Sequence, residues 1–158
     1  MDYVVVGNGG REHALGWKLG QNPRNKVFCL PGNPGMMANT ELEFIPVKPD
    51  NLELIELSLK YLSEEDPESA HKSLGSATLV VGPEGPLVSG IVDYFAERDI
   101  KVFGPTKAAA QLEGSKAFAK QFMIENHVPT ADFCRIESAE TAIKYVKLMK
   151  EPFVIKAD

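Results

Sequence analysis

The fold is decided by the stretch Val4-Val5-Val6-Gly7-Asn8-Gly9-Gly10-Arg11-Glu12-His13. Consecutive valines are typical of a strand buried on both faces, and the glycines after them allow a sharp turn into a helix. The first amides of a helix have no partner within it, and the helix dipole adds positive potential there. The stretch therefore predicts a strand, a loop and a helix that hold an anion such as phosphate, with Arg11 adding a charge-assisted hydrogen bond.

Short apolar segments alternate with helical ones in the first two thirds of the chain. The expected strands are rich in Val, Ile and Phe and cover residues 3–6, 27–30, 43–47, 78–81 and 101–103. Helices are expected over residues 11–21, 51–62 and 87–98. This alternation predicts an α/β fold, namely a doubly wound parallel sheet with helices on both faces. The polar segment 63–76 is predicted to be an exposed connection.

A second α+β unit is expected to begin near residue 105. Helical spacing covers residues 115–126 and a segment from Ser138, and strand-like runs cover residues 132–136 and 153–156. We therefore expect one domain over residues 1–104 and the start of another over residues 105–158. The second domain looks unfinished, because no sequence follows its last strand to complete a sheet.

The composition, 44% hydrophobic and 25% charged, is that of a soluble globular protein. A net charge of −5 argues against nucleic acid or an anionic membrane as a partner. The start of the chain has no basic leader, and no run approaches the roughly 20 apolar residues that span a bilayer. Cys29 and Cys134 are expected to be buried thiols, which suits a cytoplasmic protein, and they show no metal-ligand spacing with the histidines. The oligomeric state stays open.

Two further loops, residues 31–35 and 82–86, follow expected strands and are rich in turn-forming residues. In a doubly wound sheet, ligands bind beyond the carboxyl ends of the strands, so these loops are expected to form one cleft with the first. Asn33 offers an amide there, and Glu84 offers a carboxylate that suits hydroxyls or an amine. Each loop alone fits an ordinary turn, but together with the anion loop they favour a binding site.

The glycine pattern differs from the dinucleotide-binding fingerprint. That fingerprint requires a small residue where Glu12 stands and an acid near the end of the second strand, yet residues 13–40 contain no Asp or Glu. A nicotinamide or flavin cofactor, and with it an oxidoreductase, is therefore disfavoured.

Several longer motifs resemble one family, in consistent order along nearly the whole chain. They are VGNGGREHA (6–14), PGN (31–33), VGPEGPLVSG (81–90), VFGPTKAAAQLEGSKAFAK (102–120) and VIKAD (154–158). Together they resemble the glycinamide ribonucleotide synthetases, or phosphoribosylamine–glycine ligases, of the ATP-grasp superfamily. The last motif is similar to the strand before the ATP-covering glycine loop of that family.

The resemblance implies a Rossmann-like sugar-phosphate domain followed by the beginning of an ATP-grasp domain. It implies a ligase of purine biosynthesis that joins 5-phosphoribosylamine and glycine to give glycinamide ribonucleotide. In that family ATP becomes ADP and phosphate, a glycyl phosphate is the intermediate, and Mg²⁺ (or Mn²⁺) is the metal.

The resemblance also implies site residues, by motif match. Gly9, Gly10 and Arg11 would lie at the substrate phosphate, and Lys116 and Lys156 would hold ATP phosphates. The full set implied for substrate binding is Gly7, Asn8, Gly9, Gly10, Arg11, Glu12, Pro31, Gly32, Asn33, Gly82, Pro83 and Glu84. The resemblance gives no catalytic residue and no metal ligand within this chain.

The chain departs from the family pattern at two points. Segment 63–76 looks longer than usual, and the sequence ends where the ATP-covering loop would begin. We therefore expect that these 158 residues alone do not turn over. The alternative is a non-catalytic module that binds a nucleotide or sugar phosphate, in which Lys116 and Lys156 would not matter.

Overall fold

The computed structural model of the chain describes residues 1–39, 41–64, 77–148 and 152–157. Contacts within the chain group it into two units, Met1–Ala110 and Gln111–Asp158, which are described separately below. The domain boundary expected after residue 104 remains a prediction. The predicted connection 63–76 lies, beyond Glu64, outside the described residues.

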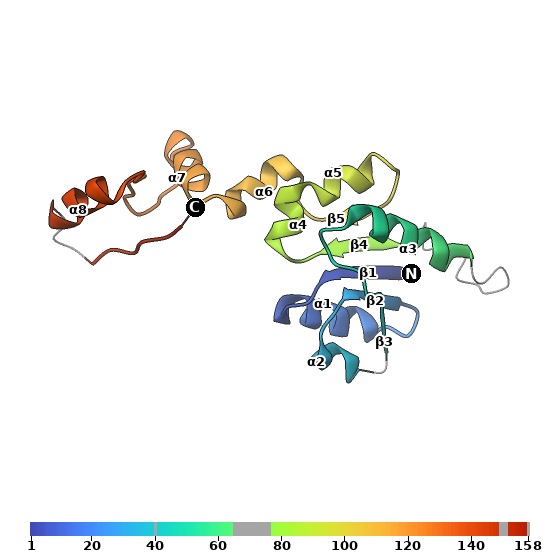
Figure 1. Cartoon of the computed structure of the whole chain (residues 1–158). Helices are drawn as coiled ribbons and strands as arrows, with labels where there is room; N and C mark the ends of the chain where they lie inside the picture. The colour runs from blue at the N-terminus through green and yellow to red at the C-terminus, as the bar shows by residue number, and fades with distance from the viewer. Residues whose placement is uncertain (40, 65–76, 149–151, 158) are drawn as a thin grey trace. The chain divides into compact units, whose positions relative to one another are not determined.

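The first unit is built on a five-stranded sheet in which every neighbouring pair is parallel, in the order β3-β2-β1-β4-β5 (Figure 1). Its strands are β1 (Asp2–Gly7), β2 (Lys26–Pro31), β3 (Leu42–Phe44), β4 (Thr78–Val81) and β5 (Val102–Phe103). Central β1 pairs Val5 with Cys29 of β2 and with Val80 of β4. The predicted parallel α/β sheet is confirmed.

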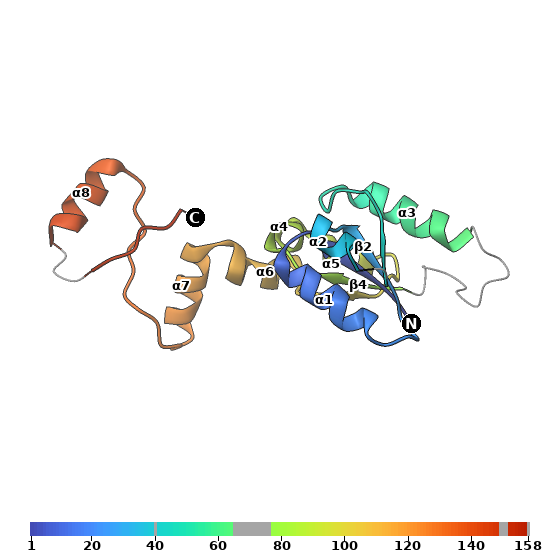
Figure 2. The same ribbon diagram turned by 90° about the horizontal axis from the view of Figure 1, so that it is seen from below.

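Helices cover both faces of this sheet, as Figures 1 and 2 show. They are α1 (Gly10–Gly20) and α2 (Pro34–Met37) on one face, and α3 (Leu52–Glu64), α4 (Glu84–Ser89) and α5 (Ile91–Ala96) on the other. The strand period of two decides the faces: Val4 and Val6 pack in the core under α3, α4 and α5, whereas Val5 packs with Met36 of α2. A doubly wound sheet follows from this alternation.

Three elements differ from the sequence-based expectation. The helix expected over 87–98 is two helices, because Gly90 between them adopts a φ of 99° that favours glycine. The strand expected over 43–47 ends at Phe44, shortly before Pro46, which has no N–H to donate to a ladder. Helices α2 and α6 (Lys107–Gly114) were not expected.

The second unit contains α7 (Lys116–Glu125) and α8 (Ala139–Leu148), which agree with the predicted helices. Ser115 caps α7 by accepting a hydrogen bond from the Phe118 amide at 3.1 Å. The strands expected over 132–136 and 153–156 are wrong, since both segments are irregular. A strand needs a neighbour for its N–H and C=O groups, and no ladder reaches these segments within the part of the chain described.

Where the structure describes the chain, no helix is both long and apolar enough to cross a membrane. The two cysteines are free thiols, Cys29 buried and Cys134 only partly so. The expectation of two buried thiols is therefore correct for Cys29 and wrong for Cys134, because the second unit does not enclose its segment 132–136.

Candidate functional site

Three loops meet at the carboxyl edge of the sheet, because parallel strands end at the same side. The loop after β1 is joined to the loop after β2 by the Gly32 amide, which donates to the Gly7 carbonyl at 3.3 Å. The loop after β4 is joined to β1 by the Gly82 amide, which donates to the Val6 carbonyl at 3.2 Å. The structure thus brings all three predicted loops of the first unit together.

The amino-terminal end of α1 has no side-chain cap. Its N-cap residue is Gly9, in extended conformation, which has no side chain to accept a hydrogen bond from the first turn. A Cβ added to Gly10 would meet no atom within 4 Å, so open space lies beside the backbone of the first helical residue. Asn8, Gly9 and Gly10 are exposed. A helix start of this kind presents amides and positive dipole potential to an anion.

Arg11 ties the first loop to the third. Its guanidinium donates a hydrogen bond to the carbonyl of Gly82, 71 positions along the chain, while the residue as a whole remains exposed. A guanidinium has five N–H donors, so it can bind more than one acceptor at once. Arg11 therefore lies at the mouth of the loop and connects it to the loop after β4.

Glu12 lies beneath the first loop, with 4% of its surface exposed. Its Oε2 accepts a hydrogen bond from the Gly9 amide at 2.7 Å. A Cβ on Gly82 would come within 2.0 Å of Oε1, and a Cβ on Gly7 within 2.6 Å of Cγ. Gly7 also has a φ of 128°. Both glycines are therefore required by the packing of one carboxylate side chain.

The loop after β2 is held by Asn33. Its Oδ1 caps α2 by accepting from the Met36 amide at 3.0 Å, and its Nδ2 donates to the Asn8 carbonyl at 2.9 Å. Gly32 has a φ of 75°, and a Cβ there would lie 2.7 Å from the Phe44 ring. The predicted residues Pro31, Gly32 and Asn33 thus lie beside the first loop. The sequence did contain the signal for the cap, since Asn followed by Pro is typical of a helix start.

Glu84 begins α4, after Pro83 at its N-cap, and its side chain is exposed. A carboxylate in the first turn of a helix is stabilised by the helix dipole. Glu84 is thus accessible after β4, while its predicted role in substrate binding remains a prediction.

Lys116 and Lys156 lie in the second unit, and both are exposed. Lys116 donates to the Glu113 carbonyl at 2.8 Å, and Lys156 lies in the irregular segment 152–157. Their assignment to ATP remains a prediction. Among the described residues, no three His, Cys, Asp or Glu side chains are grouped so that they could hold a metal ion.

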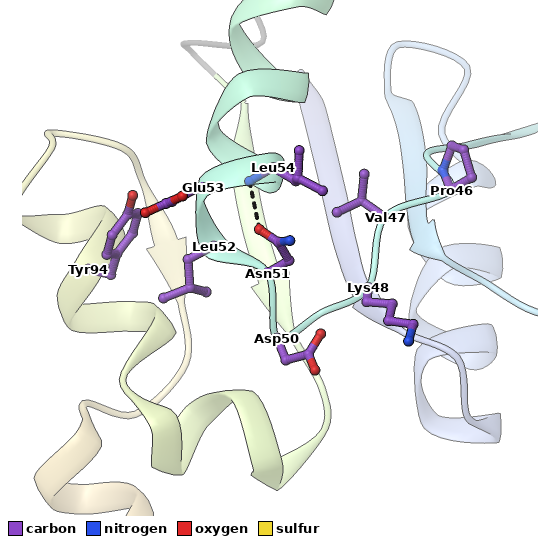
Figure 3. Close-up of a pocket in the computed structure, with 9 residues that line it drawn as sticks. All are labelled: Pro46, Val47, Lys48, Asp50, Asn51, Leu52, Glu53, Leu54 and Tyr94. Atoms are coloured by element: carbon purple, nitrogen blue, oxygen red, sulfur yellow. Dashed lines mark hydrogen bonds between the residues drawn. The ribbon is translucent and has the colours of Figure 1, made fainter.

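A separate pocket of about 670 Å³ opens on the first unit, and none of the predicted site residues line it. Figure 3 shows that it is formed by the connection after β3, the first turn of α3 and one side chain of α5. Its lining residues are Pro46, Val47, Lys48, Asp50, Asn51, Leu52, Glu53, Leu54 and Tyr94. Exposed charges of both signs line it, which favours no particular ligand, so the three loops remain the candidate site.

Comparison with known proteins gives the same family along the whole chain. Residues 1–113 match the model of the phosphoribosylglycinamide synthetase N domain, and residues 114–158 match that of its ATP-grasp (A) domain. Phosphoribosylamine–glycine ligases of Pasteurella multocida and Haemophilus influenzae are each 42% identical over 159 aligned positions, which cover 100% of this chain and 34% of those proteins.

Solved structures agree in fold. The crystal structure of phosphoribosylamine–glycine ligase from Thermotoga maritima matches with a TM-score of 0.66 and 32% identity, over 100% of this chain and 33% of that one. N5-carboxyaminoimidazole ribonucleotide synthetase from the same organism matches with a TM-score of 0.60 at 15% identity, over 91% of this chain and 36% of that one. At that identity the second likeness concerns the fold alone.

The chain spans about a third, 34%, of the length of the curated relatives it matches. The N-domain model covers residues 1–113, which is most of the chain, and the three loops with their glycines lie inside that match. The chain therefore belongs to the phosphoribosylglycinamide synthetase family, and it carries residues of the N domain and of the ATP-grasp domain.

Proposed function

We propose that this chain supplies the sugar-phosphate site of an ATP-dependent ligase that joins 5-phosphoribosylamine and glycine into glycinamide ribonucleotide, a step of purine biosynthesis. The relatives that match its whole length carry the name of that ligase. The observation that carries the proposal is the uncapped start of α1, with open space beside Gly10 and Arg11 at its mouth.

The phosphate of the substrate would lie against the first turn of α1. Amides from Gly10 onward and the guanidinium of Arg11 would provide hydrogen bonds, and the helix dipole adds favourable potential. Glu84 begins α4 at the same edge of the sheet and is exposed, so its carboxylate is suited to accept from an amine or a ribose hydroxyl.

The proposed reaction requires activation of a carboxylate, because a carboxylate oxygen is a poor leaving group. Transfer of the γ-phosphoryl group of ATP to glycine would give glycyl phosphate and ADP. Attack by the sugar amine on the acyl carbon would then form the amide bond and expel phosphate. Lys116 and Lys156 would offset negative charge on the ATP phosphates.

A cytoplasmic location is part of the proposal. It is supported by the state of the two cysteines, which are both free thiols and are compatible with a reducing compartment.

The proposal is tested by Gly10→Ala, with Gly20→Ala at the opposite end of the same helix as the matched control. Neither glycine has a positive φ, and a Cβ on Gly20 would make only ordinary contact, 3.5 Å from Leu42. Alanine in a helix replaces the more flexible glycine, so neither variant is expected to lose stability by more than about 0.5 kcal/mol.

The binding of ribose 5-phosphate to the 158-residue chain is measured by titration calorimetry. In Gly10→Ala the new methyl group would stand where the phosphate approaches the backbone, so we expect the affinity to fall by about tenfold or more, equivalent to about 1.4 kcal/mol. Gly20→Ala should bind like the wild type. Equal affinity of all three proteins would show that the phosphate does not lie at the start of α1.

A further inference from the structure

Glu12 is the one charged side chain that is buried among the described residues. Burial of a carboxylate is unfavourable unless hydrogen bonds compensate for the water it loses. Here the compensating partner is local, because Oε2 accepts from the Gly9 amide three positions earlier at 2.7 Å. The carboxylate therefore binds the backbone of the loop that begins α1, on the side of the loop that faces the protein interior.

The rest of the Glu12 side chain fills a slot between two strand ends. Its Cγ and Cδ lie against Gly7, at the end of β1, and its Oε1 lies against Gly82, just after β4. Its chain neighbour Arg11 donates to the carbonyl of the same Gly82. Two consecutive residues of α1 thus hold the loop after β4 from two directions, one by packing and one by a hydrogen bond.

This arrangement leaves little room for Glu12 to meet a ligand. One carboxylate oxygen is bonded to Gly9, the other is packed against Gly82, and 4% of the residue is exposed. The Gly9 amide is likewise committed to Glu12, so an anion at the loop would use amides from Gly10 onward.

From this geometry we infer that Glu12 is a positioning residue, which fixes the phosphate loop from beneath and does not touch the substrate. The inference rests on the proposed function for the identity of the ligand, but the contacts that carry it exist without ligand. It separates two roles within one motif: Gly10 and Arg11 face the ligand, whereas Glu12 sets the position of the backbone that does so.

Two conservative variants separate a positioning role from a ligand contact. Glu12→Gln keeps the length of the side chain and an oxygen that accepts from Gly9, but removes the charge. Glu12→Asp keeps the charge, but is one methylene shorter and cannot reach Gly9 from the same backbone position. Glu97→Gln, which removes one exposed carboxylate of the same unit, controls for a general effect of net charge.

Two measurements on the 158-residue chain decide between the roles. The first is the amide signal of Gly9 in ¹⁵N–¹H spectra without ligand, which should stay near its wild-type position in Glu12→Gln and Glu97→Gln and move in Glu12→Asp. The second is the affinity for ribose 5-phosphate, for which we expect a change of less than about threefold in Glu12→Gln and a loss of about tenfold or more in Glu12→Asp. Thermal unfolding checks that each variant is folded.

The opposite pattern overturns the inference. If Glu12→Gln loses affinity as strongly as Glu12→Asp, the carboxylate contacts the ligand; if Glu12→Asp leaves both the Gly9 signal and the affinity unchanged, Glu12 does not position the loop. If the wild type binds no ribose 5-phosphate, the proposed function fails. In that case the ligand-free Gly9 signal still decides whether Glu12 holds the loop.

Discussion

The two units of this chain contain similar apolar side chains but bury them very differently. In the first unit, Phe95, Leu79 and Ile55 are all 0% exposed, within cores on both faces of the sheet. In the second unit, Ala119 is the one buried hydrophobic residue among those described, and α8 buries none. Many of its large apolar side chains are exposed, including Phe118, Phe122, Ile143, Val154 and Ile155.

The difference shows that the predicted loop residues of the first unit and the predicted lysines of the second unit are held in place by different interactions. The loops of the first unit are fixed by a parallel sheet and by buried contacts such as those of Glu12. In the second unit, Ser115 caps α7, and Ser138 accepts from the Thr141 amide at 3.2 Å at the start of α8. Isolated helices of about 10 residues are marginal in water, so such caps contribute little stability alone.

The difference in burial between the two units is tested most strongly by replacing one phenylalanine in each unit with alanine. Phe95 is fully buried and packs edge-on against Tyr94 with ring centroids 5.1 Å apart. Phe95→Ala should lower the free energy of unfolding by about 3–5 kcal/mol, from lost burial and the remaining cavity. Phe122 is 40% exposed, so Phe122→Ala should cost less than about 1 kcal/mol.

Urea unfolding provides the measurement. The chain has one tryptophan, Trp17 in α1, whose fluorescence follows the first unit, while far-UV circular dichroism follows the helices of both. A cost for Phe122→Ala comparable to that for Phe95→Ala would contradict the comparison, because it would show that the second unit has a core of its own.

The two cysteines give a smaller and independent test. Cys29 is buried in β2, and burial raises the pKa of its thiol to about 11, whereas Cys134 of the second unit is partly exposed. The thiolate is the reactive form, so Cys29 in the fold should react with a thiol reagent at least about 100-fold more slowly than an ordinary cysteine at neutral pH.

Labelling of the native chain, followed by mass spectrometry of its peptides, measures both rates at once. Cys134 should be modified first, and Cys29 only after denaturant is added. Equal modification rates at Cys29 and Cys134 would mean that the sheet opens as readily as the second unit. The difference in burial between the two units would then not exist in solution.

The sequence predicted the sheet well because strand burial and turns leave local signals. Three consecutive valines and the glycines after them were enough to place β1, its loop and α1. The break at Gly90 was missed, because apolar residues continue at helical spacing on both sides of it and the φ of 99° is not visible in that pattern.

The meeting of the three loops was predicted from the sequence, but the hydrogen bonds that hold them within the protein were not. Glu12 and Asn33 were both expected to bind substrate from their place in the motifs, and both have hydrogen bonds within the protein. The contacts of Glu12 with Gly82 join residues 70 positions apart, which spacing along the chain cannot reveal. The prediction of two strands in the second unit was wrong for a related reason, because a strand needs a partner strand that can lie far away in the sequence.

The smallest expected effect is a difference in the free energy of unfolding between variants of two ion pairs that have the same helical spacing. Glu56–Lys60 in α3 and Glu140–Lys144 in α8 are both i,i+4 pairs, with N–O distances of 2.6 and 2.7 Å. Within the part of the chain that the structure describes, only the first pair has partners from another element: Tyr94 of α5 donates to Glu56 at 2.8 Å, and Arg98 after α5 donates at 3.2 Å. Glu56→Gln should therefore destabilise the chain more than Glu140→Gln, which leaves an exposed helix almost unchanged.

The pH dependence of stability identifies the cause of that difference. The hydrogen bond from Lys60, followed by that from Tyr94, lowers the pKa of Glu56 below its usual value. A lowered carboxyl pKa in the folded state stabilises the protein above the unfolded-state value of about 4.3, and this contribution is lost as the pH falls through the folded-state pKa.

Urea midpoints measured from neutral pH down to the acid range should therefore fall less steeply in Glu56→Gln than in the wild type, with Glu140→Gln following the wild type. Parallel curves for all three proteins would mean that the link between α3 and α5 adds nothing to an ordinary surface pair, and the first unit would then owe its stability to its apolar core alone.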